Sequence, residues 1–135
     1  MKLLEIKQLP DVLSKETLEK YLNDYLSFIE NTEKLNKLEV LESLSEFADR
    51  KVYTHQLLDA NLKLKTDQIV QTLLDISSVD MVDSYAYVVV GLNLKESYEL
   101  MKSVLDLELN EQVREIIEET IDEVGDNINI PYQSN

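Results

Sequence analysis

Residues that interrupt helices are scarce in this sequence, because its 135 residues include two glycines and two prolines. An all-β fold needs many tight turns, and tight turns draw on glycine and proline. Leu, Glu, Lys, Asp and Ile dominate instead, and 44% of the residues are apolar. That apolar fraction supports a hydrophobic core despite the high charge. The sequence therefore predicts an all-α fold, and its length predicts a single domain over residues 1–135.

Apolar residues in the N-terminal half recur at spacings of three and four, the pattern of amphipathic helices. Residues 1–13 are expected to be an N-terminal segment, of which residues 1–10, ending at Pro10, are extended or loosely attached. Ser14 is a candidate N-cap, and Asn31-Thr32 is expected to end the helix that follows it. Further helices are predicted from Leu35 to Phe47, with an exit through Ala48-Asp49-Arg50, and from about Val52 to Leu62, with Leu57, Leu58 and Leu62 in the core. Residues 14–65 would thus form a helical-bundle part of the domain.

The C-terminal half predicts four more helices with recognisable starts or ends. Thr66 or Asp67 can cap the first, Ser78 the second and Asn110 the last. Gly91 and Gly125 are expected just past the second and the last helix, in the left-handed conformation. The predicted helices are Thr66–Ile76, Ser78–Val90, Leu94–Leu107 and Asn110–Val124. Residues 127–135, which contain Pro131, are expected to be an irregular tail.

Two stretches of this half align with each other. Residues 68–76 match residues 99–107 at an offset of 31, with every apolar position on an apolar one. The helices that follow match at an offset of 34, which places Val82 on Ile116 and Gly91 on Gly125. Helical hairpins repeated at this spacing are typical of stacked α-helical arrays. Residues 66–126 are therefore interpreted as two helical-hairpin repeats, with coincidence between amphipathic helices as the alternative.

The last predicted helix resembles the second helix of HEAT-like α-solenoid repeats. Asn110-Glu111-Gln112-Val113-Arg114-Glu115 has a polar turn followed by Val-Arg, and Glu123-Val124-Gly125-Asp126 has a Val-Gly close. The resemblance covers residues 66–126 and implies a fold that offers binding surfaces rather than one chemistry. We expect about six or seven helices in antiparallel hairpins, stacked as a short HEAT-like α-solenoid or a compact helical bundle.

Charge is divided unevenly along the chain. Residues 66–135 carry 15 acidic and 3 basic side chains, whereas residues 1–65 carry 12 acidic and 10 basic ones. The total of −14 opposes binding to nucleic acid or to an anionic membrane surface, and favours a basic protein partner. No apolar run approaches the roughly 18–20 residues of a membrane span. Because charges also interrupt residues 1–7 too early for a signal peptide, a soluble cytoplasmic protein is expected.

No residue pattern predicts a catalytic or metal centre. The one histidine, His55, has Asp59 one helical turn on, but a catalytic histidine also needs a nucleophile beside it. The densest acidic cluster is Glu115, Glu118, Glu119, Asp122 and Glu123. Carboxylates four residues apart can hold a hard cation, yet helical di-iron sites pair glutamate with a histidine three residues on. We predict no enzyme activity, no cofactor and no metal, with a carboxylate-based metal protein or enzyme as an alternative.

An acidic strip is predicted where the second helices of the two hairpins lie side by side. With Val82 and Ile116 facing inward, the acids between the apolar positions face outward. Tyr85 and Tyr87 point in nearly opposite directions, so one is expected inside and the other, Tyr87, outside. The predicted partner-binding residues are Asp80, Asp83, Tyr87, Glu111, Glu115, Glu118, Glu119 and Asp122. Such a strip would accelerate association with a basic protein.

The whole chain also resembles the small acidic immunity proteins of bacterial toxin systems, several of which are all-helical. The resemblance rests on size, acidity, the expected cytoplasmic setting and the missing catalytic residues. It implies a non-catalytic inhibitor that binds and neutralises a basic toxin domain, for example a nuclease. The alternative is a HEAT-like scaffold or adaptor whose acidity mainly confers solubility. The identity of the partner and the oligomeric state do not follow from the sequence.

Overall fold

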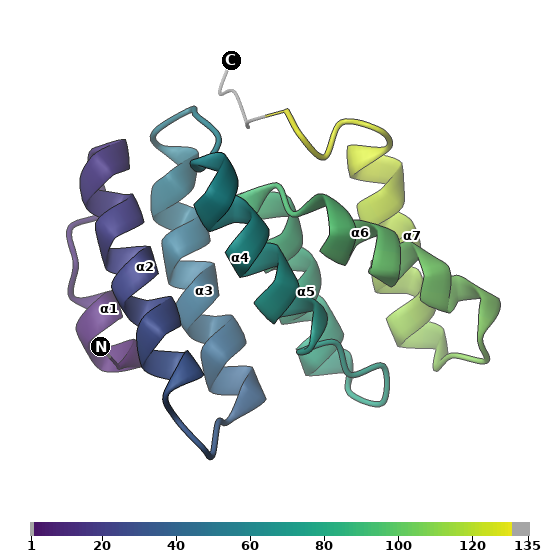
Figure 1. Cartoon of the computed structure of the whole chain (residues 1–135). Helices are drawn as coiled ribbons and strands as arrows, with labels where there is room; N and C mark the ends of the chain where they lie inside the picture. The colour runs from purple at the N-terminus through teal and green to yellow at the C-terminus, as the bar shows by residue number, and fades with distance from the viewer. Residues whose placement is uncertain (1, 131–135) are drawn as a thin grey trace.

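The computed structural model describes residues 2–130, which are all-helical without a β-strand in that range (Figure 1). The elements are α1 (Leu3–Lys7), α2 (Lys15–Glu30), α3 (Lys37–Val52), α4 (Ala60–Gln71), α5 (Val79–Leu92), α6 (Lys95–Ser103), the 3-10 helix η1 (Val104–Asp106) and α7 (Glu111–Val124). The prediction of an all-α chain with about six or seven helices is confirmed. Pro131 and the rest of the predicted tail beyond residue 130 lie outside the described residues.

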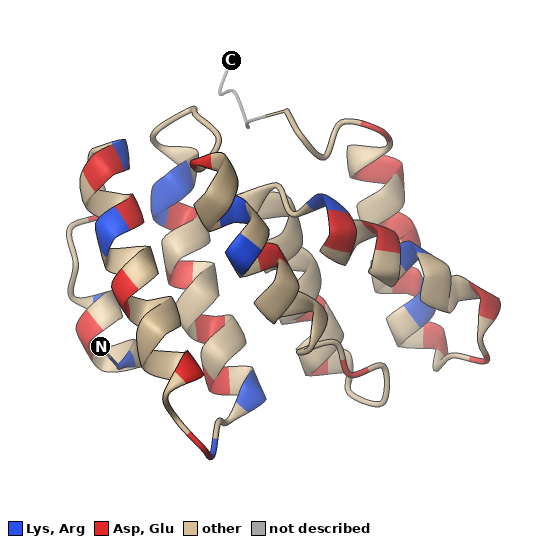
Figure 2. Cartoon of the chain, viewed as in Figure 1, with Lys and Arg blue, Asp and Glu red and all other residues tan. Residues whose placement is uncertain are grey.

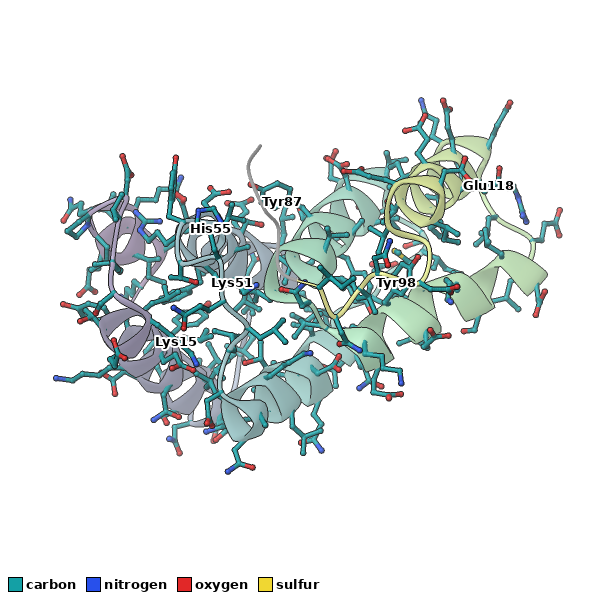
Figure 3. The ribbon with its side chains drawn as sticks, turned by 90° about the horizontal axis from the view of Figure 1, so that it is seen from above. Lys15, Lys51, His55, Tyr87, Tyr98 and Glu118 are labelled. Atoms are coloured by element: carbon teal, nitrogen blue, oxygen red, sulfur yellow. The ribbon has the colours of Figure 1, made fainter. Side chains whose placement is uncertain are left out.

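The helices are arranged in two layers (Figures 1 and 3). α1, α3, α5 and α7 pack in succession along one layer, and α2, α4 and α6 pack in succession along the other. Each loop crosses between the layers, so α2/α3, α4/α5 and α6/α7 are antiparallel hairpins stacked side by side. The prediction of stacked hairpins is confirmed, and the α2/α3 hairpin continues the same two layers toward the N-terminus.

Two buried tyrosines connect the two layers through their hydroxyl groups. Tyr85 of α5 donates to the carbonyl oxygen of Ser97 in α6 at 2.7 Å, and Tyr98 of α6 donates to that of Gly125 at 2.9 Å. Both phenol rings are buried, and a buried polar group is tolerated when it has a hydrogen-bond partner. The layers are therefore held together by these directional bonds as well as by the apolar core.

Helix ends follow the local capping signals at four predicted positions. The side chains of Ser14, Ser78 and Asn110 each accept a hydrogen bond from a backbone N–H in the first turn of α2, α5 and α7. Such a bond satisfies one of the donors that a helix leaves free at its start. Gly125 ends α7 with a φ of 56°, a conformation that favours glycine.

The predicted boundaries between residues 47 and 76 are wrong. α3 continues through Ala48-Asp49-Arg50 to Val52, and residues 53–59 form a loop instead of a third helix. α4 begins after Asp59, whose side chain accepts from the N–H of Asn61 at 3.2 Å. In the next hairpin, α6 ends at Ser103 and gives way to η1, so the helix predicted to reach Leu107 is shorter.

Thr66 and Asp67, predicted as caps, lie buried inside α4. The Thr66 hydroxyl donates to the carbonyl oxygen of Leu62 within the same helix at 2.7 Å. The Asp67 carboxylate accepts from the backbone N–H groups of Glu96 at 3.0 Å and Ser97 at 2.8 Å. Asp67 therefore caps the neighbouring helix α6 rather than its own helix. The N-cap residue of α6 is Leu94, whose side chain cannot accept a hydrogen bond.

Gly91 lies inside α5 rather than just past its end, so its predicted capping role is wrong. Asn93 takes the left-handed position instead, with a φ of 59°. A Cβ added to Gly91 would lie 2.6 Å from the Cβ of Ala48 on α3. Glycine at this position therefore lets α3 and α5 approach more closely than any side chain would allow.

The N-terminal segment is helical in part and attached over residues 2–10, contrary to the prediction of an extended or loosely attached stretch. α1 packs on α3 and buries Ile6 completely. The guanidinium of Arg50, itself 3% exposed, donates to the carbonyl oxygens of Leu9 at 2.9 Å and Pro10 at 3.0 Å. A five-residue helix gains its stability from such tertiary contacts, which explains why periodicity alone did not reveal it.

The segment after α7 is held by Asn93. Its side-chain amide donates to the carbonyl oxygens of Ile128 at 2.8 Å and Ile130 at 3.1 Å, and its side-chain oxygen accepts from the buried ammonium of Lys51. Burial, and secondarily the positive charge of Lys63, lowers the pKa of Lys51 to about 8. One polar cluster therefore joins the ends of α3 and α5 to the C-terminal segment.

Candidate functional site

Acidic residues occur along α7 and along α3, while basic residues gather at the C-terminal end of α3 and on α4 (Figure 2). The layer α1–α3–α5–α7 therefore presents much of the negative charge. Two adjacent hollows open on this layer, and their shape decides which of the acids act together.

The first hollow is a groove of about 350 Å³ between α3, α5 and α7. Its apolar lining consists of Ala48, Val52, Ala86, Val90, Gly91 and Ile116. Three of these residues have a methyl group or no side chain, which leaves space between helices that approach closely. The groove is therefore a direct result of small residues at the α3–α5 contact.

The rim of the groove is acidic. Asp83 lines it from α5, and Glu119 and Glu123 line it from α7, with Thr120 between them. Glu119 and Glu123 are four residues apart and so lie on the same face of α7. The three carboxylates are exposed, so they remain hydrated and available to a positively charged partner.

The second hollow, of about 620 Å³, lies beside the groove and shares Val52 and Tyr87 with it. Its acidic lining residues are Asp11, Glu46 and Asp49. Arg50 also lines this hollow, but its guanidinium is occupied by backbone carbonyls and by Glu46 at 3.5 Å. The two hollows together form one band, which we call the groove face, with an apolar part and a polar part.

Tyr87 stands at the boundary of the two hollows, and Figure 3 shows its side chain on the outer side of α5. Its hydroxyl donates a hydrogen bond to the Asp49 carboxylate of α3. That bond, followed by burial and by the charges of Asp49 and Glu46, raises the pKa of Tyr87 to about 12. The ring is 53% exposed whereas that of Tyr85 is buried, so the prediction of one inside and one outside is confirmed.

The structure divides the eight predicted partner-binding residues into separate groups. Asp83, Tyr87 and Glu119 line the groove together. Asp80 is exposed in the first turn of α5 but does not line the groove. The remaining residues lie on the outer face of α7, which we define as Glu111, Glu115, Glu118 and Asp122.

The outer face of α7 points away from both the core and the groove. At about 100° per residue, its four positions fall opposite the buried Val113 and Ile117 and about 100° or more from Ile116, which lines the groove; Glu115, one turn before Glu119, lies nearest to the rim. Figure 3 shows Glu118 toward the α7 end of the molecule, whereas Tyr87 lies near the middle. Glu118 pairs with Arg114 at 3.8 Å, an exposed contact of small energetic value. The single predicted strip is thus two surfaces.

Four acidic residues of the groove face were missing from the predicted site: Asp11, Glu46, Asp49 and Glu123. Glu123 carried a usable signal, because it lies four residues after Glu119. Glu46 and Asp49 are three residues apart on α3, but the predicted helix ended at Phe47 and hid that pairing. Asp11 follows α1 and had no signal, since only tertiary contacts place it beside α3.

His55 lies in the loop after α3 with a φ of 54°, and lines the polar hollow. The predicted helical relation between His55 and Asp59 is wrong, because residues 53–59 are not a helix. Asp59 instead caps α4, and its backbone N–H donates to the Glu19 carboxylate at 2.6 Å.

Two kinds of site are not found among residues 2–130. No group of three acidic, histidine or cysteine side chains in this range is placed to hold a metal ion. No helix in the described part of the chain is long and apolar enough to cross a membrane.

The fold and the groove face define an all-helical protein of stacked antiparallel hairpins with an acidic surface around an apolar groove. Comparison with other proteins adds no relative, because no family model, no curated protein and no solved structure matches the chain.

Proposed function

We propose that this chain is a non-catalytic, protein-binding inhibitor. Its most concrete form is a bacterial immunity protein that neutralises a basic toxin in the cytoplasm, a nuclease being one example. The partner would be held by charge and shape complementarity, so neither a cofactor nor a metal is required. The acidic surfaces of the HEAT-like hairpin stack would provide the contact.

One observation carries the proposal: six carboxylates surround the two connected hollows of the groove face. They come from the loop after α1, from α3, from α5 and from α7. Negative charge concentrated in this way steers a positively charged protein and raises its association rate, by about ten- to a thousandfold at low salt. The apolar lining supplies the desolvated centre that stable interfaces use.

The test begins with genes adjacent to this one, among which a basic toxin is expected. The purified toxin domain and this chain should form a stoichiometric complex that abolishes the toxin's activity. Affinity should fall steeply as salt rises from about 50 to about 500 mM, because exposed charges are then screened. Unchanged association over that range would contradict the acidic-surface mechanism.

A HEAT-like scaffold or adaptor is the second candidate, and the layered stacking of the three hairpins favours it. Acidity would then mainly confer solubility. Simultaneous reversal of charge at Asp83, Glu115 and Glu118 should leave partner binding intact in a scaffold. The same triple variant should weaken binding in an inhibitor that uses charge.

A further inference from the structure

Electrostatic steering alone does not require an apolar groove. The groove between α3, α5 and α7 is nevertheless lined by Ala86, Val90 and Ile116, and its base is the Gly91–Ala48 contact. Carboxylates border this apolar lining on the α5 side, at Asp83, and on the α7 side, at Glu119 and Glu123. This surface matches a partner segment that has an apolar stripe with positive charge on both sides.

The size of the groove limits what it can receive. Its volume of about 350 Å³ is at the lower end of the roughly 300–1,000 Å³ of pockets that enclose a small ligand. It therefore suits one or two large apolar side chains projecting from a longer segment. The polar hollow beyond Tyr87 has room for further cationic side chains next to Glu46 and Asp49.

We infer that the groove face docks a basic amphipathic helix of the partner protein. One or two apolar side chains of that helix enter the groove, and flanking Lys or Arg side chains pair with Asp83, Glu119 and Glu123. Cations farther along the helix reach Glu46 and Asp49, past the Tyr87 ring that Asp49 holds in place. A helix lying in a groove is an established recognition mode, and this inference rests on the proposed function.

The probe for this inference is a model peptide of leucine and lysine, about 14 residues long, with its leucines on one helical face. A control peptide replaces the leucines by serine and keeps the charge. Binding to the ¹⁵N-labelled full chain is followed by fluorescence anisotropy and by chemical-shift changes. We expect shifts centred on Ala86, Val90 and Thr120, and affinity at least about tenfold weaker for the serine peptide.

Two variants with equal changes in charge test the position of the site. The groove variant combines Asp83→Lys, Glu119→Lys and Glu123→Lys. The control variant combines Asp106→Lys, Glu108→Lys and Glu111→Lys at exposed positions where α7 begins, far from the groove, and leaves the Arg114–Glu118 pair in place. The groove variant should lose about tenfold or more in affinity for the leucine peptide, and the control less than about threefold, because salt screens charges beyond roughly 10 Å.

Each result separates the groove from the broader proposal. Equal affinity for the two peptides, or shifts centred on the outer face of α7, would overturn the groove inference even if one variant misfolds. Loss of affinity only in the control variant would overturn it while leaving an acidic inhibitor possible. Peptide binding in the groove without inhibition of any basic toxin would support the docking surface and count against the inhibitor.

Discussion

Replacing Asp67 by alanine removes the carboxylate that links α4 to the start of α6. Asp67 is 4% exposed and accepts three hydrogen bonds, from the backbone N–H of Glu96 at 3.0 Å and from the N–H and hydroxyl of Ser97 at 2.8 Å and 2.5 Å. The variant leaves the two N–H donors beside a small cavity that offers no equivalent acceptor, whereas the Ser97 hydroxyl keeps the backbone carbonyl oxygen of residue 67 at 3.1 Å. The first turn of α6 then loses its cap and its attachment to the neighbouring hairpin.

The expected cost follows from the groups left without partners. Loss of an N-cap costs about 1 kcal/mol, and a hydrogen bond to a charged group contributes about 1.5–3 kcal/mol, without strict additivity. We therefore expect Asp67→Ala to lower the free energy of unfolding by about 3 kcal/mol. For a domain of this size that corresponds to a melting temperature about 10 °C lower.

Urea denaturation followed by circular dichroism measures this change directly. Asp24→Ala, at an exposed position of α2, is the matched control and should stay within about 0.5 kcal/mol of the parent. Asp67→Asn, which keeps one side-chain acceptor, should fall between the two. A loss below 1 kcal/mol in Asp67→Ala, similar to the control, would refute the argument that this carboxylate caps α6.

Three further predictions concern contacts between distant parts of the chain. Lys51 has a pKa of about 8 in the folded chain and 10.5 in the unfolded chain, so between these pH values its amine is protonated mainly in the unfolded chain. The free energy of unfolding should therefore rise by about 1.5 kcal/mol from pH 8 to 9.5. Lys51→Met should abolish that rise in urea titrations at the two pH values. Gly91→Ala should lose about 1–3 kcal/mol through overlap with Ala48, and adding Ala48→Gly should restore most of the loss in thermal melts; absence of rescue would contradict the close-approach argument. Arg50→Lys should lose the two guanidinium hydrogen bonds to the carbonyl oxygens of Leu9 and Pro10. Amide hydrogen exchange in α1 should then be at least about tenfold faster. Unchanged exchange would show that apolar packing alone holds α1.

The features that sequence reasoning predicted correctly are local ones. The caps Ser14, Ser78 and Asn110 act on N–H groups two or three residues away, so their effect can be read from neighbouring residues. The apolar periodicity likewise predicts which face of each long helix is buried, because core burial follows the helical repeat. Scarcity of glycine and proline completes the all-α prediction.

The errors concern residues whose partners are far away along the chain. Asp67 and Gly91 carry local signals for helix ends, yet Asp67 caps a helix 29 residues on and Gly91 meets Ala48 of another hairpin. The short helix α1 has too few residues to show periodicity and depends on its packing against α3. These three contacts form only because particular helices become neighbours, and the spacing of residues along the sequence does not encode which helices do so.

The same distinction applies to the candidate site. The sequence alone predicts that the second half is acidic, that α5 and α7 carry outward-facing acids and that hairpins stack. The packing of α3, α5 and α7 brings Asp83, Tyr87, Glu119 and Glu123 to one groove, and the groove lining does not include Glu111, Glu115, Glu118 or Asp122. The two sets of residues separate because core packing sets how each helix is rotated about its axis. A rotation of about 100°, one residue, moves a carboxylate from the groove to open solvent.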